Sequence, residues 1–265
     1  MNSMKSIRFT LPACGVLISA LAASPAAADV TLKQKTNGRG PIGAAADGES
    51  ITYIKGLKFR SDQTAGNRQT SMLMDVGGTQ MIVLNHEKKE ADVFDMSKMS
   101  ESMGELVSVS DIKSSFTPTG QTRQIAGSTC AVYDVSITMP VKIANMPMTM
   151  AMTGPYCLVK NGPGQADFAA FYKAAAEKGF VFGDPRAAKA SPTPRAMTEM
   201  YRKMSELGVP FAMDTTIKTT GEGPMAAIMS KMGNAGMTSE VVSVSTDAIA
   251  ESMFEIPAGY KINKR

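Results

Sequence analysis

Residues 71–85 read SMLMDVGGTQMIVLN. Two mostly apolar runs flank Gly77-Gly78, and a glycine pair accepts the positive φ angles of a tight primed turn. This stretch therefore predicts a β-hairpin. The charged turn Glu87–Glu90 and the apolar run Ala91–Met96 follow directly, so we expect the hairpin to continue into a β-meander.

Further strands are expected on both sides of this meander. Turn signals recur along the chain and apolar residues often alternate with polar ones between them, which is typical of β-structure. Within a strand over 51–60, we place Ile51, Tyr53, Leu57 and Phe59 toward the core. The other expected strands cover residues 30–35, 122–125, 130–138, 146–153, 156–160, 211–220 and 237–245.

Two later stretches space their apolar residues three or four positions apart, as amphipathic helices do. One covers about Gln165–Lys178 and the other begins at Thr193, while Ser97–Leu106 and Asp247–Phe254 predict a short helix and a helical turn. The expected fold class is α+β and mainly β. We expect one strongly curved antiparallel sheet with two or three helices covering its open face, because the apolar side of a sheet must be buried.

The first 28 residues have the pattern of a cleavable signal peptide. Lys5 and Arg8 precede an apolar run over residues 9–22, and Ala26 and Ala28 supply the small residues that a signal peptidase needs. The apolar run is shorter than the roughly 20 residues of a membrane span, although an N-terminal anchor helix is the alternative. We expect cleavage after Ala28 and a periplasmic protein.

The remaining chain, residues 29–265, has a length that suits a single β-rich domain. Removal of Lys5 and Arg8 lowers the formal net charge from +4 to +2. A nearly neutral chain lacks the basic stripe of a nucleic-acid surface, so we expect no nucleic-acid partner.

Two cysteines, Cys130 and Cys157, remain after the signal peptide. An even number of cysteines in an exported protein favours a disulfide between them. Two buried free thiols are the alternative.

Motifs for catalysis and metal binding are missing from the sequence. His86 is the sole histidine and lies beside a charged turn, so we expect a solvated residue rather than a catalytic base. One histidine and two cysteines cannot complete a structural zinc site. The glycine clusters lack the spacing of phosphate-binding loops. We therefore expect no enzyme and no cofactor.

The chain contains 22 methionines, of which Met1 and Met4 leave with the signal peptide. The densest run places Met146, Met148, Met150 and Met152 at alternate positions, which on a strand is one face. Three interpretations compete: ordinary core packing, an adaptable apolar ligand cavity, and Cu(I) binding by thioether sulfurs.

Four segments carry a family resemblance: ITYIKGLKFR at 51–60, MLMD through MIVLN at 72–85, IAGSTCAVY at 125–133 and MFEIPAGY at 253–260. Their order and spacing resemble an uncharacterised exported bacterial domain family, which is similar to the LolA/LolB-type periplasmic lipoprotein carriers. The resemblance spans most of residues 30–262.

The resemblance implies a LolA-like half-barrel closed by helices around an apolar cavity. In the carriers, such a cavity holds lipoprotein acyl chains, whose burial is favourable by about 0.8 kcal/mol per CH₂. We predict a periplasmic, non-enzymatic binding protein that holds a lipid or other hydrophobic ligand against Met146, Met148, Met150 and Met152. Lipid or lipoprotein acyl chains are the expected partners, with peripheral contact to the envelope membrane. The alternatives are Cu(I) binding by the same methionines and an envelope structural or stress protein without a small ligand.

Overall fold

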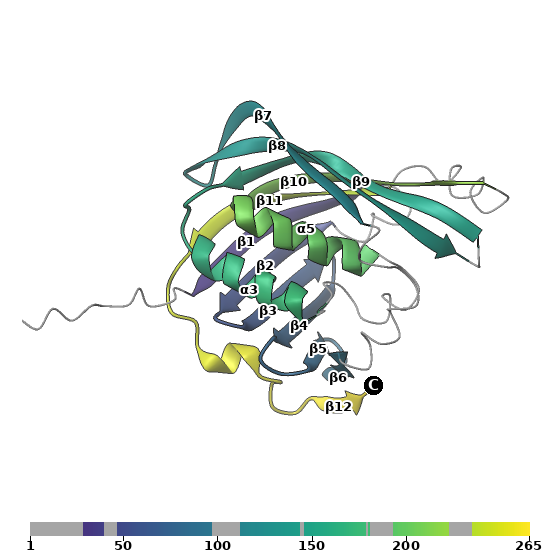
Figure 1. Cartoon of the computed structure of the whole chain (residues 1–265). Coiled ribbons are helices and arrows are strands. Elements are labelled where there is room, and N and C mark those ends of the chain that lie inside the picture. The colour runs from purple at the N-terminus through teal and green to yellow at the C-terminus, as the bar shows by residue number, and fades with distance from the viewer. Residues whose placement is uncertain are drawn as a thin grey trace, which may run out of the picture.

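The computed structural model describes residues 29–39, 47–96, 112–143, 146–178, 180, 193–222 and 235–265. Within these residues, twelve strands form one sheet in the order β12-β6-β5-β4-β3-β2-β1-β11-β10-β9-β8-β7 (Figure 1). Neighbouring strands are antiparallel, except that β12 runs parallel to β6. The strands are β1 (Val30–Arg39), β2 (Gly48–Lys55), β3 (Lys58–Ala65), β4 (Arg68–Asp75), β5 (Gln80–Asn85), β6 (Glu90–Asp95), β7 (Lys113–Ile125), β8 (Ser128–Ile143), β9 (Met146–Val159), β10 (Val209–Gly221), β11 (Ala235–Ser245) and β12 (Lys261–Lys264).

The helical elements in the described part of the chain are α3 (Gln165–Glu177), α5 (Thr193–Leu207) and a 3₁₀ turn, η3 (Glu251–Phe254). These agree with the predicted helices and helical turn. The helix predicted over Ser97–Leu106 lies outside the described residues. Helices α3 and α5 lie side by side on one face of the sheet, which bends around them (Figure 1). We call this the inner face and the opposite one the outer face.

The expected half-barrel covered by two or three helices is wrong. The sheet is open, because β12 and β7 stand at its two ends and do not pair with each other. Twelve strands at a spacing of about 4.8 Å make a sheet on the order of 50 Å wide. A helix of 13 or 15 residues is only about 20 Å long, so neither described helix spans the width of the sheet.

The hairpin β4–β5 confirms the prediction from residues 71–85, but its turn differs from the expected primed type. Neither Gly77 nor Gly78 has a positive φ. The Asp75 carboxylate instead accepts a hydrogen bond from the Gly77 N–H at 2.8 Å, and the Gly78 N–H donates to the Asp75 carbonyl at 3.0 Å. Hydrogen bonds to the Asp75 side chain and carbonyl therefore stabilise this turn, without the positive φ angles of a primed turn.

The single strand predicted over 51–60 is wrong, since a turn at Gly56, with φ of 56°, divides it into β2 and β3. The predicted facing is correct for Phe59, which is buried, and wrong for Ile51, Tyr53 and Leu57. Ile54 is fully buried, whereas Ile51 and Tyr53 are half-buried and Leu57 is 41% exposed. Both alternating sets in this segment contain apolar residues, so the pattern alone indicated the wrong set.

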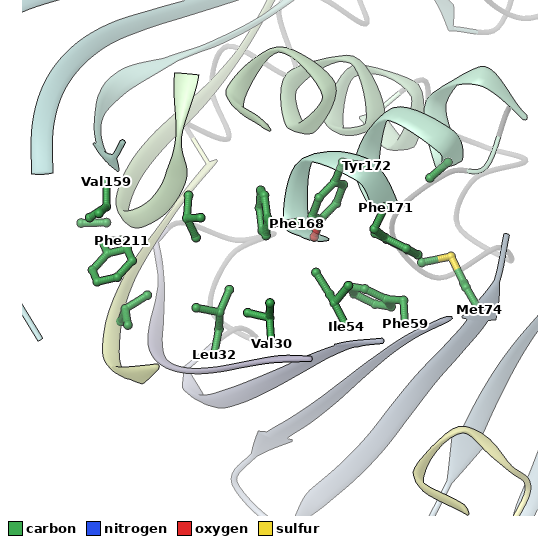
Figure 2. Packing of buried hydrophobic residues seen from close by; sticks show 14 of the residues in the cluster. Val30, Leu32, Ile54, Phe59, Met74, Val159, Phe168, Phe171, Tyr172 and Phe211 are labelled. Carbon is green, nitrogen blue, oxygen red and sulfur yellow. The ribbon is translucent and has the colours of Figure 1, made fainter. Parts of the chain in front are cut away.

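The main core lies where α3 meets the inner face. In register across β1, β2 and β3, Val30, Ile54 and Phe59 form an apolar row beneath the helix. Phe168 and Phe171 of α3 point down onto this row (Figure 2). The Phe59 and Phe171 rings stack with centroids 5.2 Å apart.

The strand β9 is continuous, although the sequence predicted two strands around Gly154-Pro155. A side chain at Gly154 would place its Cβ only 1.8 Å from the carbonyl oxygen of Asp214 on β10. Glycine is therefore required for the close approach of β9 and β10.

We predict that Gly154→Ala lowers the free energy of unfolding by about 2–4 kcal/mol, because the backbones of β9 and β10 must separate. Urea denaturation measures this loss. The control is Gly78→Ala, where a Cβ meets only the Asp75 carbonyl oxygen at 3.5 Å. Equal stability of the two variants would contradict the close-approach argument.

The Cys130–Cys157 disulfide is present, as predicted, with the two Cα atoms 5.3 Å apart. It joins the neighbouring strands β8 and β9, and both residues are buried in the main core. The bond closes a loop between residues 27 positions apart. Such a cross-link restricts the unfolded chain and stabilises the fold in the chain-entropy account.

We predict that replacing both cysteines with alanine lowers the free energy of unfolding by about 3 kcal/mol. Denaturant unfolding with and without reductant measures the effect. Reduction should lower the stability of the natural chain and leave that of the double variant unchanged. A natural chain that is insensitive to complete reduction would sink the prediction.

Candidate functional site

A cavity of about 230 Å³ lies between the inner face of the sheet and the helix pair. Tyr172 of α3 and Tyr201 of α5 line it on the helix side. Strands β1 to β4, β10 and β11 line it on the sheet side. The lining residues of the sheet are Gln34, Thr36, Glu49, Ser50, Thr52, Phe59, Ser61, Gln63, Thr64, Ala65, Met72, Met213, Met237 and Ser239.

The register of the strands explains the chemistry of the cavity floor. Directly opposite residues of antiparallel strands point to the same face. The apolar row beneath α3 is followed along β2 and β3 by the pair Thr52 and Ser61, and then by Ser50 and Gln63. The inner face thus changes from apolar to hydroxyl- and amide-bearing as the strands leave the main core, and the cavity lies at this change.

The roof of the cavity is aromatic and uncharged. The rings of Tyr172 and Tyr201 stack with centroids 4.6 Å apart. Burial raises the pKa of Tyr172 well above its ordinary value, and burial also raises the pKa of Tyr201. Both phenols therefore stay neutral at physiological pH and present ring faces and neutral hydroxyls.

Glu49 is the one charged residue among the described lining residues. Its carboxylate pairs with Lys33 at 3.0 Å. Successive residues of a strand face opposite sides, and Ser50 and Thr52 face inward, so the Glu49 side chain points to the outer face. The cavity wall formed by described side chains is therefore uncharged.

The methionine run lies next to the cavity, in a separate packed cluster. Met148, Met150 and Met152 are buried on the inner face, as the alternation predicted, against Met200 and Met204 of α5. They are not among the cavity-lining residues. The backbone of Met146 belongs to β9, and its side chain lies outside the described part of the structure.

Tyr156 connects this methionine cluster to the neighbouring strand. Its hydroxyl lies 2.7 Å from the Thr215 hydroxyl and donates to the Met200 sulfur at 3.2 Å. Burial raises the pKa of Tyr156 to about 12, so this phenol remains a neutral donor. The polar atom is therefore satisfied inside an otherwise apolar cluster.

His86 is half-buried and hydrogen-bonded, in contrast to the solvated residue expected from the sequence. Its Nε2 lies 2.6 Å from the Ser71 hydroxyl and its Nδ1 lies 2.7 Å from the Tyr260 hydroxyl. The Ser71 hydroxyl donates a hydrogen bond to Asp62 Oδ1, with 2.5 Å between the two oxygens. Nε2 of neutral His86 must then donate to Ser71, while Nδ1 accepts from Tyr260.

This network fastens the C-terminal segment to the outer face and does not form a nucleophile–base pair. Tyr260 and Ile256 pack there against the buried cluster of Leu73, Leu84 and Ala91. Ser71 is 1% exposed. Its hydroxyl donates a hydrogen bond to Asp62, so the arrangement lacks the exposed, base-activated hydroxyl of a serine nucleophile.

In the described residues, no three His, Cys, Asp or Glu side chains gather closely enough to hold a metal ion. None of the helices that the structure describes is long and apolar enough to cross a membrane.

Comparisons with known proteins establish no family. No protein-family model and no curated protein matches the chain. An uncharacterised conserved protein from Thermus thermophilus is similar with a TM-score of 0.39 and 7% identity, over 90% of this chain and 91% of that one. PNGF-II is similar with a TM-score of 0.35 and 9% identity, over 90% of this chain and 32% of that one. At these scores neither establishes a shared fold, and neither links the chain to the LolA/LolB-type carriers.

Sequence reasoning missed the cavity-lining polar residues. Ser50, Ser61 and Ser239 were assigned no role, although each is less than 9% exposed. The available signal was a small polar residue at an inward position of a strand whose neighbouring inward residues are apolar. This signal can be recognised only when the residues of β2 and β3 that point to the inner face are known.

We predict that falling pH destabilises the protein through His86. Burial lowers the pKa of His86, so the unfolded chain takes up the proton more readily than the folded one. The stabilisation of the folded state by neutral His86 is fully present above the ordinary pKa of about 6.5. It is lost as the pH falls through the lower pKa of His86 in the folded chain. Urea unfolding at pH 7.5 and 5.5 measures it.

The comparison variant for this pH series is His86→Gln, which keeps hydrogen-bonding groups and cannot titrate in this range. Its loss of stability between the two pH values should be smaller than that of the natural chain. An equal loss in both proteins would show that other groups cause the pH dependence.

Proposed function

We propose that this protein is a non-enzymatic binding protein that holds one small hydrophobic or amphipathic ligand in the cavity beneath Tyr172 and Tyr201. One observation carries the proposal: a partly apolar cavity lies between the helix pair and the sheet, next to a well-packed core. Ligand pockets are typically concave and mainly apolar, with a few fixed polar groups. The predicted export signal and the disulfide are consistent with the envelope location that we propose for this function.

The size of the cavity limits the ligand. A volume of about 230 Å³ corresponds to roughly eight water molecules at about 30 Å³ each. A cavity of this volume can enclose a ligand with a short alkyl chain or a single ring system. It is too small to enclose the several acyl chains of a lipoprotein. We therefore place the hydrophobic ligand in the cavity beneath the tyrosines and not against the methionine run.

We predict that filling the cavity abolishes binding. Ser61 is 7% exposed and lines the floor, so Ser61→Leu would occupy the space with an apolar side chain. The affinity for a fluorescent apolar probe should fall at least tenfold, measured by titration. The matched control is Ser243→Leu at an exposed position of β11.

Thermal unfolding of both variants accompanies this titration, because a misfolded Ser61→Leu protein would also fail to bind. A folded Ser61→Leu protein with unchanged probe affinity would exclude the cavity as the binding site. Native mass spectrometry of protein isolated from its own compartment would show whether a ligand of this size accompanies the chain.

Cu(I) binding is a second candidate function, favoured by the gathering of thioethers in one cluster. The methionines of this cluster come from β8, β9, α5 and β10 and are Met139, Met148, Met150, Met152, Met200, Met204 and Met213. Thioether sulfur is a soft ligand that selects Cu(I). Ordinary packing accounts for the same cluster, since methionine fills irregular gaps in a core.

A Cu(I) titration separates copper binding from packing. If the cluster binds copper, replacing Met148, Met150 and Met152 with leucine should weaken Cu(I) binding at least tenfold. The fold should survive, because each volume-conserving exchange costs less than about 1.5 kcal/mol. Met253→Leu, outside the cluster, is the control. A natural chain that binds Cu(I) no better than a weak competing chelator would remove this candidate.

A further inference from the structure

Ser239 of β11 is a cavity-lining residue with a buried hydroxyl. The residue is 5% exposed and lines the cavity. Its Oγ has no hydrogen-bond partner within the described structure. A buried hydroxyl without a partner is costly, and buried polar groups in native proteins are generally hydrogen-bonded to protein, to an ordered water or to a bound molecule.

The position of Ser239 in the sheet places its side chain on the inner face, beside the cavity. It is directly opposite Thr36 of β1 on one side and Met213 of β10 on the other. Both partners also line the cavity, so the three side chains share the inner face. The Thr36 hydroxyl donates to the Gly48 carbonyl at 3.3 Å. The Ser239 hydroxyl thus lies beside one partner that is engaged elsewhere and one that is apolar.

The other lining residues set the second requirement for the ligand. Phe59, Met72, Tyr172 and Tyr201 give an apolar and aromatic surface. The Glu49 carboxylate points away to Lys33, and no lysine or arginine occurs among the described lining residues. An ionised ligand group would lose its hydration here without gaining an opposite charge, which is unfavourable.

We infer that the cavity takes a neutral amphiphile, with its apolar part against the aromatic wall and a hydroxyl or carbonyl oxygen hydrogen-bonded to Ser239. This rests on the proposed function, because it names the ligand class of the same cavity. The chemistry needed is one uncharged polar group on a short apolar body of about eight non-hydrogen atoms, within the room of about 230 Å³.

Three probes with the same eight-carbon chain test this inference: 1-octanol, octanoate and octylammonium. Binding to the folded full chain is measured by displacement of a fluorescent apolar probe at pH 7.5. We expect 1-octanol to bind at least tenfold tighter than either charged probe. Tighter binding of octanoate or octylammonium would overturn the inference.

The residue itself is tested with Ser239→Ala, which removes the hydroxyl and leaves the cavity open. The affinity for 1-octanol should fall about three- to tenfold, as expected for one neutral hydrogen bond. Ser243→Ala on the same strand, at an exposed position, should bind 1-octanol like the natural chain.

The outcomes separate this inference from the proposed function. If neither the fluorescent probe nor any octyl compound binds, the proposed function fails and the ligand class fails with it. If the three octyl probes bind equally, or Ser239→Ala binds 1-octanol like the natural chain, the cavity still binds ligands but the inference is overturned.

Discussion

The packing of the aromatic face of α3 onto the apolar row of β1, β2 and β3 is the contact on which the rest of the molecule depends. Phe171 stacks on Phe59, and Phe168 and Tyr172 continue the contact toward α5. Burial of rings of this size contributes more per residue than aliphatic packing does. This contact fixes the helix pair against the sheet and thereby sets the depth of the space that remains beside it.

The cavity is a consequence of side-chain size along the strands. Where the inner face carries Ile54 and Phe59, helix and sheet meet without a gap. Where the same strands carry Ser50 and Ser61, the side chains are too short to reach the helices. The two tyrosines bridge part of that distance, and the space left has an aromatic wall on the helix side and a wall of mixed small polar and apolar groups on the sheet side.

Much of the secondary structure could be predicted from the sequence, because alternation and helical spacing are local signals. The meander and α3 follow from such signals, whereas the disulfide follows from the even number of cysteines. The division of residues 51–60 into two strands could not be predicted in the same way, since Thr52 and Ile54 alternate with Ile51 and Tyr53 without a clear apolar set. Facing there depends on pairing with β1, which is a long-range contact.

The candidate site was harder to predict than the fold. The methionine spacing correctly placed Met148, Met150 and Met152 on one buried face, but spacing cannot distinguish a filled core from a cavity wall. That distinction depends on what packs opposite, and here α5 brings Met200 and Met204 into the same space. Ser239 illustrates the converse, because an isolated serine in a strand has no sequence signal until its neighbours across the sheet are known.

The sheet order also determines when the chain can finish folding. The first strand, β1, pairs with β11, and the last strand, β12, pairs with β6. During synthesis from the N-terminus, one edge of β1 and one edge of β6 therefore stay unpaired until β11 and β12 have been made. Such long-range closure is slow and leaves the growing polypeptide prone to association.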